Sequence, residues 1–88
     1  MYRLNTCFVT LYASIYTIDR KLFEGEADSI TLPGSDGELG VLPTHIPLIT
    51  ALQRGTIKIR QGTKNEFIDI IGGFVEVQPE SRVVILAA

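Results

Sequence analysis

The stretch GTIKIRQGTKNEFIDI, residues 55–70, decides the fold of this chain. Its first half places Ile57 and Ile59 at alternate positions, and its second half does the same with Ile68 and Ile70. Apolar side chains at every second position predict a strand with one buried face. The intervening QGTKN is short, polar and contains glycine, which is typical of a hairpin loop. The stretch therefore predicts a β-hairpin with one apolar face.

The same alternation recurs on both sides of this hairpin. Ile30 and Leu32 share one face of ADSITLP, and Val75 and Val77 share one face of FVEVQ. RVVILAA, residues 82–88, is apolar almost throughout, which predicts a strand buried on both faces. We expect chain reversals at FEGEAD and at QPES. Short strands at intervals of about ten residues predict an all-β antiparallel sandwich or barrel.

Composition excludes several classes of function. The 88 residues predict one small domain, and the net charge of −2 lacks the basic patch of a nucleic-acid-binding protein. One cysteine and one histidine exclude an internal disulfide bond and a zinc site with four Cys and His ligands. No run reaches the roughly 20 apolar residues of a membrane-spanning helix. The N-terminal segment continues into a strand-like pattern, which favours a strand over a signal peptide. One free cysteine favours an intracellular setting.

LPGSDGELGVLPTHIPL, residues 32–48, is the segment where catalysis has to be considered, because it concentrates glycine, proline, acids and the single histidine. A small hydrolase would combine His45 with Cys7 or Ser35 as nucleophile, and the two side chains would need to lie within hydrogen-bonding reach. The GSDG segment lacks the strand–turn–helix elbow that presents a catalytic serine. We therefore expect no catalytic residue.

The same segment also lacks the signals of a metal or cofactor site. Asp36 and Glu38 lie in a glycine-rich stretch where solvent keeps carboxylates close to their ordinary behaviour. A phosphate-binding loop needs a following helix and usually a lysine, and here VLP follows, with Lys58 as the next lysine. The DGE sequence does not match a calcium-binding loop. A charged surface loop that holds its shape through glycine and proline is the remaining interpretation.

The run LFEGEADSITLPGSDGELGVLPTHIPLITAL, followed by G-x-I-x-I and by GGFVEVQP, resembles the epsilon subunit of F-type ATP synthases. The likeness extends over about residues 15–88. It implies a flattened antiparallel β-sandwich of about ten short strands in two sheets. It also implies a non-catalytic rotor subunit of the central stalk, without cofactor or metal, which couples proton transport to ATP synthesis. Its expected place is the cytoplasmic face of the bacterial plasma membrane, peripheral and held there only through the complex.

The resemblance also assigns two sets of contact residues. The c-ring-facing set surrounds the acid of GELG and consists of Asp36, Glu38 and Leu39. The set facing the gamma subunit follows from the motifs LP-x-H, T-A-L and GGF-x-E and consists of His45, Thr50, Ile71, Phe74 and Glu76.

Two departures from the family pattern limit what the resemblance implies. IYTIDRKLF lacks the early proline of the family. The chain stops at VVILAA, where most relatives continue into a helical hairpin that is associated with ATP binding and inhibition. We therefore expect neither nucleotide binding nor hairpin-type inhibition from these residues. A free-standing β-sandwich adaptor for other proteins is the alternative function.

Overall fold

The structure of this chain is a computed structural model, and it describes residues 10–43 and 47–88. These residues form nine strands and no helix, and so they include no helix that is long and apolar enough to cross a membrane. The strands are β1 (Leu11–Tyr16), β2 (Lys21–Ala27), β3 (Ser29–Gly34), β4 (Gly37–Val41), β5 (Leu48–Leu52), β6 (Gly55–Gln61), β7 (Lys64–Ile70), β8 (Gly73–Gln78) and β9 (Arg82–Ala87). The prediction of an all-β sandwich is confirmed, with nine strands in the described residues where about ten were expected.

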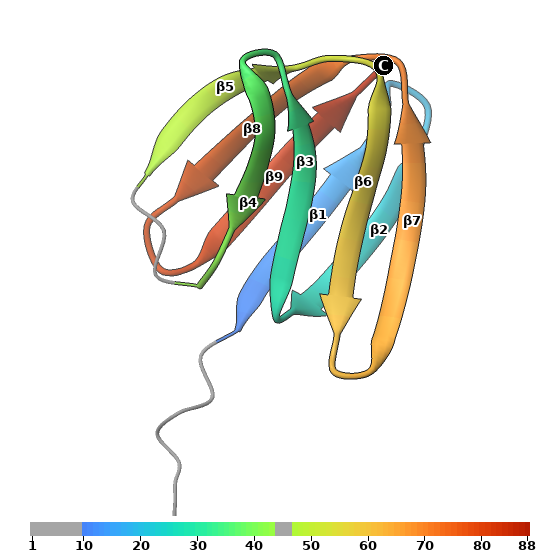
Figure 1. Cartoon of the computed structure of the whole chain (residues 1–88). Helices are drawn as coiled ribbons and strands as arrows, with labels where there is room; N and C mark the ends of the chain where they lie inside the picture. The colour runs from blue at the N-terminus through green and yellow to red at the C-terminus, as the bar shows by residue number, and fades with distance from the viewer. Residues whose placement is uncertain (1–9, 44–46) are drawn as a thin grey trace, which may run out of the picture.

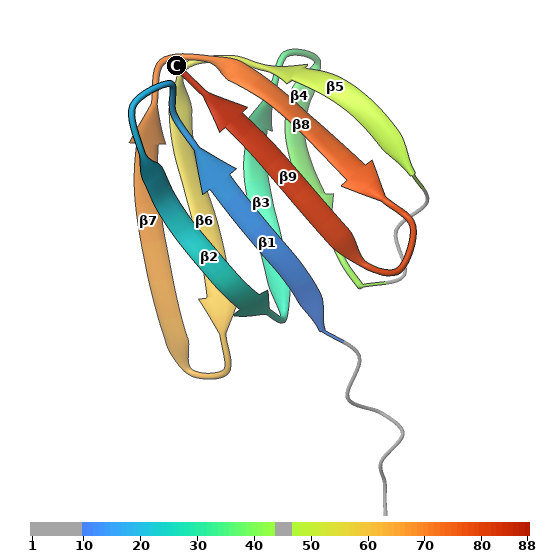
Figure 2. The same ribbon diagram turned by 180° about the vertical axis from the view of Figure 1, so that it is seen from behind.

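The nine strands form one sheet that curls into two facing layers (Figures 1 and 2). The back layer has the order β2-β1-β9-β8-β5, and the front layer has the order β4-β3-β6-β7. The layers join where Gly34 of β3 pairs with Leu52 of β5. All strand pairs are antiparallel except β1 and β9, which run side by side in parallel. The expected two sheets are therefore two layers of one sheet, mostly antiparallel.

The core fills the space between the layers. Ile57 and Ile59 of β6 are fully buried, as are Ile30 and Leu32 of β3. Thr56 and Lys58, which alternate with these residues, are exposed. Burying one such side chain contributes about 1.5–3 kcal/mol relative to leaving it in water. The alternation read from residues 55–70 is thus confirmed. The back layer supplies the other half of the core, chiefly Leu11, Ile15, Val75, Val77, Val83 and Ile85.

The two sides of the sandwich differ in the hydrogen bonds that join its layers. Where β2 approaches β6, the Asp28 N–H donates to the Arg60 carbonyl at 2.8 Å, and the Gly62 N–H donates to Asp28 Oδ2 at 2.6 Å. On the opposite side, the described residues join the layers at the Gly34–Leu52 pair, flanked by two hydrogen bonds, and where the Ser81 hydroxyl donates to the Pro43 carbonyl. A Cβ on Gly34 would lie 2.6 Å from the Gly37 carbonyl oxygen, so only glycine fits there. Within the described residues, the layers are therefore hydrogen-bonded on the β2–β6 side, while the β4–β5 side is open between Gly34 and Pro43.

Three sequence-based expectations need correction. RVVILAA is buried on one face only, because Val83 and Ile85 point into the core while Leu86 is exposed. The layer to which β9 belongs is covered on one side alone. FEGEAD is mostly strand β2, since pairing with β1 keeps it extended until Asp28. Residues 32–41 form a β-hairpin with a turn at Ser35 and Asp36, so this part is less of a loop than expected.

Candidate functional site

The outer face of the back layer carries adjoining apolar side chains. We call this surface the apolar face; it consists of Tyr16, Ile49, Ala51, Phe74, Val84 and Leu86. Strand register places Leu86 between Tyr16 and Phe74, and Ala51 on the far side of Phe74. Ile49 is 71% exposed, Phe74 60% and Leu86 58%. Large apolar side chains gathered in this way mark a surface that binds another molecule.

A shallow depression of about 350 Å³ lies at one end of the apolar face. Tyr16, Phe74 and Leu86 line it together with Ile18, which is 98% exposed in the connection between β1 and β2. Apolar walls and an exposed isoleucine suit an apolar side chain of a partner protein, because both would leave water on contact. The depression thus gives the apolar face a place for an anchoring residue.

A small polar network borders the apolar face on β1 and β2. Glu24 accepts a hydrogen bond from Lys21 Nζ at 2.6 Å and one from the Tyr12 hydroxyl at 2.5 Å. The bond from Lys21, then that from Tyr12, lowers the pKa of Glu24. The bond to Glu24 raises the pKa of Lys21 and that of Tyr12. The network therefore holds Glu24 ionised beside the apolar surface.

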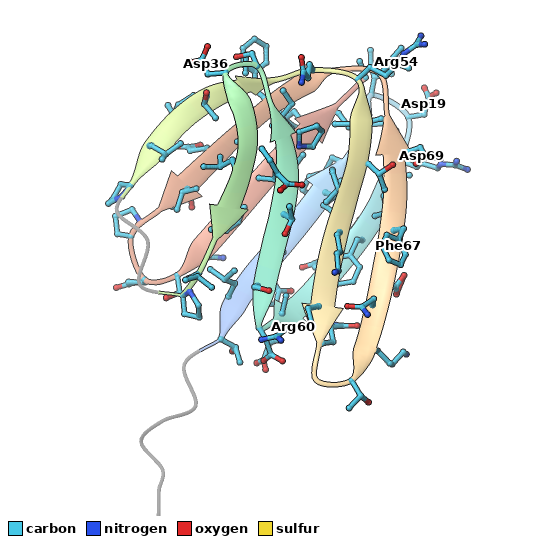
Figure 3. The ribbon with its side chains drawn as sticks, in the orientation of Figure 1. Asp19, Asp36, Arg54, Arg60, Phe67 and Asp69 are labelled. Atoms are coloured by element: carbon cyan, nitrogen blue, oxygen red, sulfur yellow. The ribbon has the colours of Figure 1, made fainter. Side chains whose placement is uncertain are left out.

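The outer face of the front layer is polar. Thr56 Oγ1 donates to Asp69 Oδ1 at 2.7 Å across β6 and β7. Lys58 and Arg60 follow Thr56 on the same face of β6. Phe67 is 64% exposed, lies opposite Lys58, and projects away from β7 close to Asp69 (Figure 3). One exposed aromatic ring among polar neighbours needs no partner.

The c-ring-facing residues predicted from the sequence lie together. Asp36 occupies the tip of the β3–β4 hairpin (Figure 3), and Glu38 and Leu39 follow on β4. All three line a hollow of about 250 Å³ between β4 and β5. Thr50, predicted to face the gamma subunit, lines the same hollow from β5. We call this feature the β4–β5 hollow; its walls are Gly34, Asp36, Gly37, Glu38, Leu39, Leu48 and Thr50.

The gamma-facing residues predicted from the sequence do not share one surface. Phe74 and Glu76 point outward from β8, Phe74 as part of the apolar face. Thr50 pairs with the buried Val75 and points to the inner side of the back layer. Ile71 is exposed in the bend between β7 and β8, where its N–H donates to the Ala88 carbonyl at 3.3 Å. His45 lies outside the described residues.

Nothing in the described residues assembles a catalytic centre from the candidates named above. Ser35 is exposed in a two-residue hairpin turn, with a strand on either side and no helix behind it. Cys7 and His45 lie outside the described residues. Across residues 10–43 and 47–88, no group of three or more His, Cys, Asp and Glu side chains could hold a metal ion.

Sequence reasoning missed most of the apolar face. Val84 and Leu86 lie in an unbroken apolar run, and the sequence analysis gave Ile49 no role. The available signal was the alternation itself. Once Val83 and Ile85 are placed in the core, Val84 and Leu86 have to face outward on the same strand.

The chain is similar in sequence to known proteins of one family. Residues 10–88 match the model of the β-sandwich domain of the ATP synthase delta/epsilon chain. The chain is 48% identical over 73 residues to the ATP synthase epsilon chain of Desulforamulus reducens, covering 83% of this chain and 54% of the relative. It is 41% identical over 78 residues to that of Halalkalibacterium halodurans, covering 89% and 58%. The chain thus spans about half the length of these curated relatives.

Two solved structures share the fold at low sequence identity. A chain in the mitochondrial ATP synthase of Euglena gracilis, in a structure of OSCP, F1 and c-ring, matches with a TM-score of 0.85 at 24% identity, over 94% of this chain and 53% of that one. A chain in the central stalk and c-ring structure of the Tetrahymena thermophila mitochondrial ATP synthase matches with a TM-score of 0.75 at 17% identity, over 88% and 62%. Together with the family model and the curated relatives, these matches show that the chain belongs to the ATP synthase delta/epsilon family through its β-sandwich domain.

Proposed function

We propose that this chain is a non-catalytic subunit of the central stalk of a proton-translocating F-type ATP synthase. In this role it binds the gamma subunit, contacts the c-ring and helps to couple proton transport to ATP synthesis at other subunits. Its relatives are named ATP synthase epsilon chains, and one structural neighbour belongs to a central stalk and c-ring assembly. The proposed location is the cytoplasmic face of the bacterial plasma membrane, peripheral and through the complex.

The apolar face is the observation that carries the gamma-binding proposal. Ile49, Phe74 and Leu86 are all more than half exposed and lie on three adjacent strands of the back layer. Covering them with a partner removes apolar surface from water and favours association. Binding to the folded state also stabilises a small domain that has no disulfide bond. Phe74 from the predicted set belongs to the apolar face, and Glu76 lies between Ile49 and Val84 on the same outer side of the layer. We add Ile49, Val84 and Leu86 to these two residues.

The tip of the β3–β4 hairpin is the proposed c-ring contact. Asp36, Glu38 and Leu39 are close to one another there, and both carboxylates are exposed. Exposed acids on a short hairpin are free to pair with polar or basic groups of a neighbouring loop. A two-residue turn leaves the tip little conformational freedom to lose on contact. We propose that ATP binding is not a function of these 88 residues.

Isothermal titration calorimetry with the gamma subunit of the same organism tests the proposal. The key variant is Leu86→Lys, and the matched control is Phe67→Lys, an equally exposed apolar residue on the polar face of the front layer. A lysine ammonium enclosed in an apolar interface is costly, so we expect Leu86→Lys to weaken binding about a hundredfold or more. Phe67→Lys should leave Kd within about a factor of two. A wild-type chain that does not bind gamma contradicts the proposal, as does equal binding by the two variants.

A further inference from the structure

Strand β4 lies at the open side of the sandwich, and one of its two edges has no partner strand among the described residues. Within the described residues, β4 pairs with β3 and with no other strand. The opposite side differs, because Asp28, Gln61 and Gly62 hydrogen-bond across it. An unpaired edge is a template for another strand unless the protein blocks it. Whether the edge of β4 can accept a strand depends on the direction of its backbone N–H and C=O groups.

The direction of the β4 backbone follows from the hydrogen bonds of β3. The Pro33 carbonyl accepts the Gln53 N–H at 2.8 Å and so points away from β4. Pro33 and its partner Glu38 are therefore a pair without mutual hydrogen bonds, and the N–H and C=O of Glu38 also point away from β3. The alternation of an antiparallel ladder gives Gly40, two residues on, the same direction. Glu38 and Gly40 thus aim four backbone groups at the open side.

Strand β5 borders the same opening from the back layer. Its Ala51 carbonyl accepts the Ser35 N–H at 3.1 Å and so points away from β8. By the same alternation, the backbone groups of Ile49 point toward the open side as well. Between the two edges lies the β4–β5 hollow, into which Leu39, Leu48 and Thr50 face. An added strand would find hydrogen-bonding partners at its side and half-buried leucines beneath it.

We propose that the edge of β4 receives an extended segment of the gamma subunit as an added strand. This inference rests on the proposed function. Strand β5 connects the two surfaces, because Ile49 belongs to the apolar face while Thr50 faces the hollow. A gamma subunit bound to the apolar face therefore needs only to pass around β5 to reach β4.

The lining of the hollow specifies the chemistry of the added segment. Alternate side chains of an added strand point inward, where Leu39 and Leu48 favour small apolar residues. Among the described residues of the lining, Asp36 and Glu38 carry the charge, and their carboxylates belong to the proposed c-ring contact at the hairpin tip. The segment therefore presents small apolar side chains to the hollow, and its backbone supplies the hydrogen bonds of strand addition.

Gly40→Pro tests the inference, with Gly40→Ala as the matched control. Proline removes the outward N–H of Gly40 and fills the edge, and an edge strand tolerates proline where its N–H faces solvent. A Cβ at Gly40 would meet nothing within 4 Å, so alanine keeps both the fold and the N–H. With purified gamma subunit, we expect Gly40→Ala to bind like wild type and Gly40→Pro to bind about tenfold more weakly or worse.

Amide hydrogen exchange of the wild-type chain provides a second readout that does not depend on a variant. The Gly40 amide should exchange rapidly in the free chain and clearly more slowly in the gamma complex. Unchanged exchange of this amide on binding overturns the inference, whatever Gly40→Pro does, and so does equal binding by Gly40→Pro and Gly40→Ala. A wild-type chain that does not bind gamma overturns the proposed function, and strand addition by gamma with it.

Discussion

The two outer faces of this sandwich are built by the same alternation and have opposite chemistry. Leu86 on β9 has Tyr16 and Phe74 as its cross-strand neighbours, whereas Phe67 on β7 has Lys58. Strand β9 is central in its layer and β7 is an edge strand. An exposed apolar residue therefore becomes part of a larger apolar surface where neighbouring strands place apolar side chains beside it, and such a surface favours binding. The inner faces specify the fold, and the difference between the outer faces indicates the function.

The largest expected effect separates the inner from the outer face of one strand. Ile85→Ala should destabilise the chain by about 2–5 kcal/mol, because it leaves a cavity between the layers. Leu86→Ala, the next residue, should cost less than about 1 kcal/mol, since its side chain is mostly in water. Urea unfolding followed by circular dichroism measures both. Equal losses would show that the outer face is part of the core.

Making the polar face apolar is the second test. Lys58→Ile would place an isoleucine directly beside Phe67 and so form an apolar patch across β6 and β7. We expect this variant to self-associate as its concentration rises, because the new patch has no partner in the chain. Analytical ultracentrifugation would detect it, with Lys58→Gln as a control that stays at the wild-type mass. A monomeric Lys58→Ile would refute the rule that neighbouring strands make a binding surface.

A smaller effect concerns the hydrogen bond on the polar face. Thr56→Val keeps the shape of the side chain and removes the hydroxyl that donates to Asp69. The loss should be about 0.5–1 kcal/mol, because the bond lies in solvent. In the Asp69→Asn background the same substitution should cost less, which a double-mutant cycle in urea measures. A loss above about 2 kcal/mol would mean that this hydrogen bond stabilises the fold more than an exposed hydrogen bond normally does.

The smallest effect is a pH dependence at the border of the apolar face. Lys21 and Tyr12 lower the pKa of Glu24 in the folded chain. The stability that this carboxylate contributes is therefore present above its unfolded pKa and is lost as the pH falls through the lower folded pKa. Between about pH 7 and pH 3, the urea midpoint of wild type should fall more than that of Glu24→Gln. Parallel falls in the two chains would exclude a contribution from this network.

The fold was largely predictable because its main signal is local. Ile57 and Ile59 alternate with polar residues, and this pattern needs no knowledge of the rest of the chain. The predictions that were wrong concern residues whose structure depends on strands that are distant in the sequence. FEGEAD carries the composition of a turn, yet pairing with β1 makes it a strand. Whether Leu86 is covered depends on the arrangement of the layers, which no pattern within residues 82–88 contains.

The site was less predictable than the fold. The motifs pointed to Phe74 and Glu76, and these residues do lie on the outer face of the back layer. Thr50 was predicted with them, but its strand position turns it toward the β4–β5 hollow. Ile49, one residue earlier, takes the outer position instead. A one-residue step along a strand reverses the direction of the side chain, so a motif alone cannot assign a residue to a surface.

Methyl NMR with the gamma subunit tests the central claim most directly. The chain would carry labelled methyl groups and be titrated with unlabelled gamma subunit. We expect the signals of Ile49, Val84 and Leu86 to shift or broaden, while Thr31 and Thr56 on the outer face of the front layer keep their positions. If Thr31 and Thr56 shift and the methyl groups of the apolar face do not, the gamma subunit binds the front layer and not the apolar face.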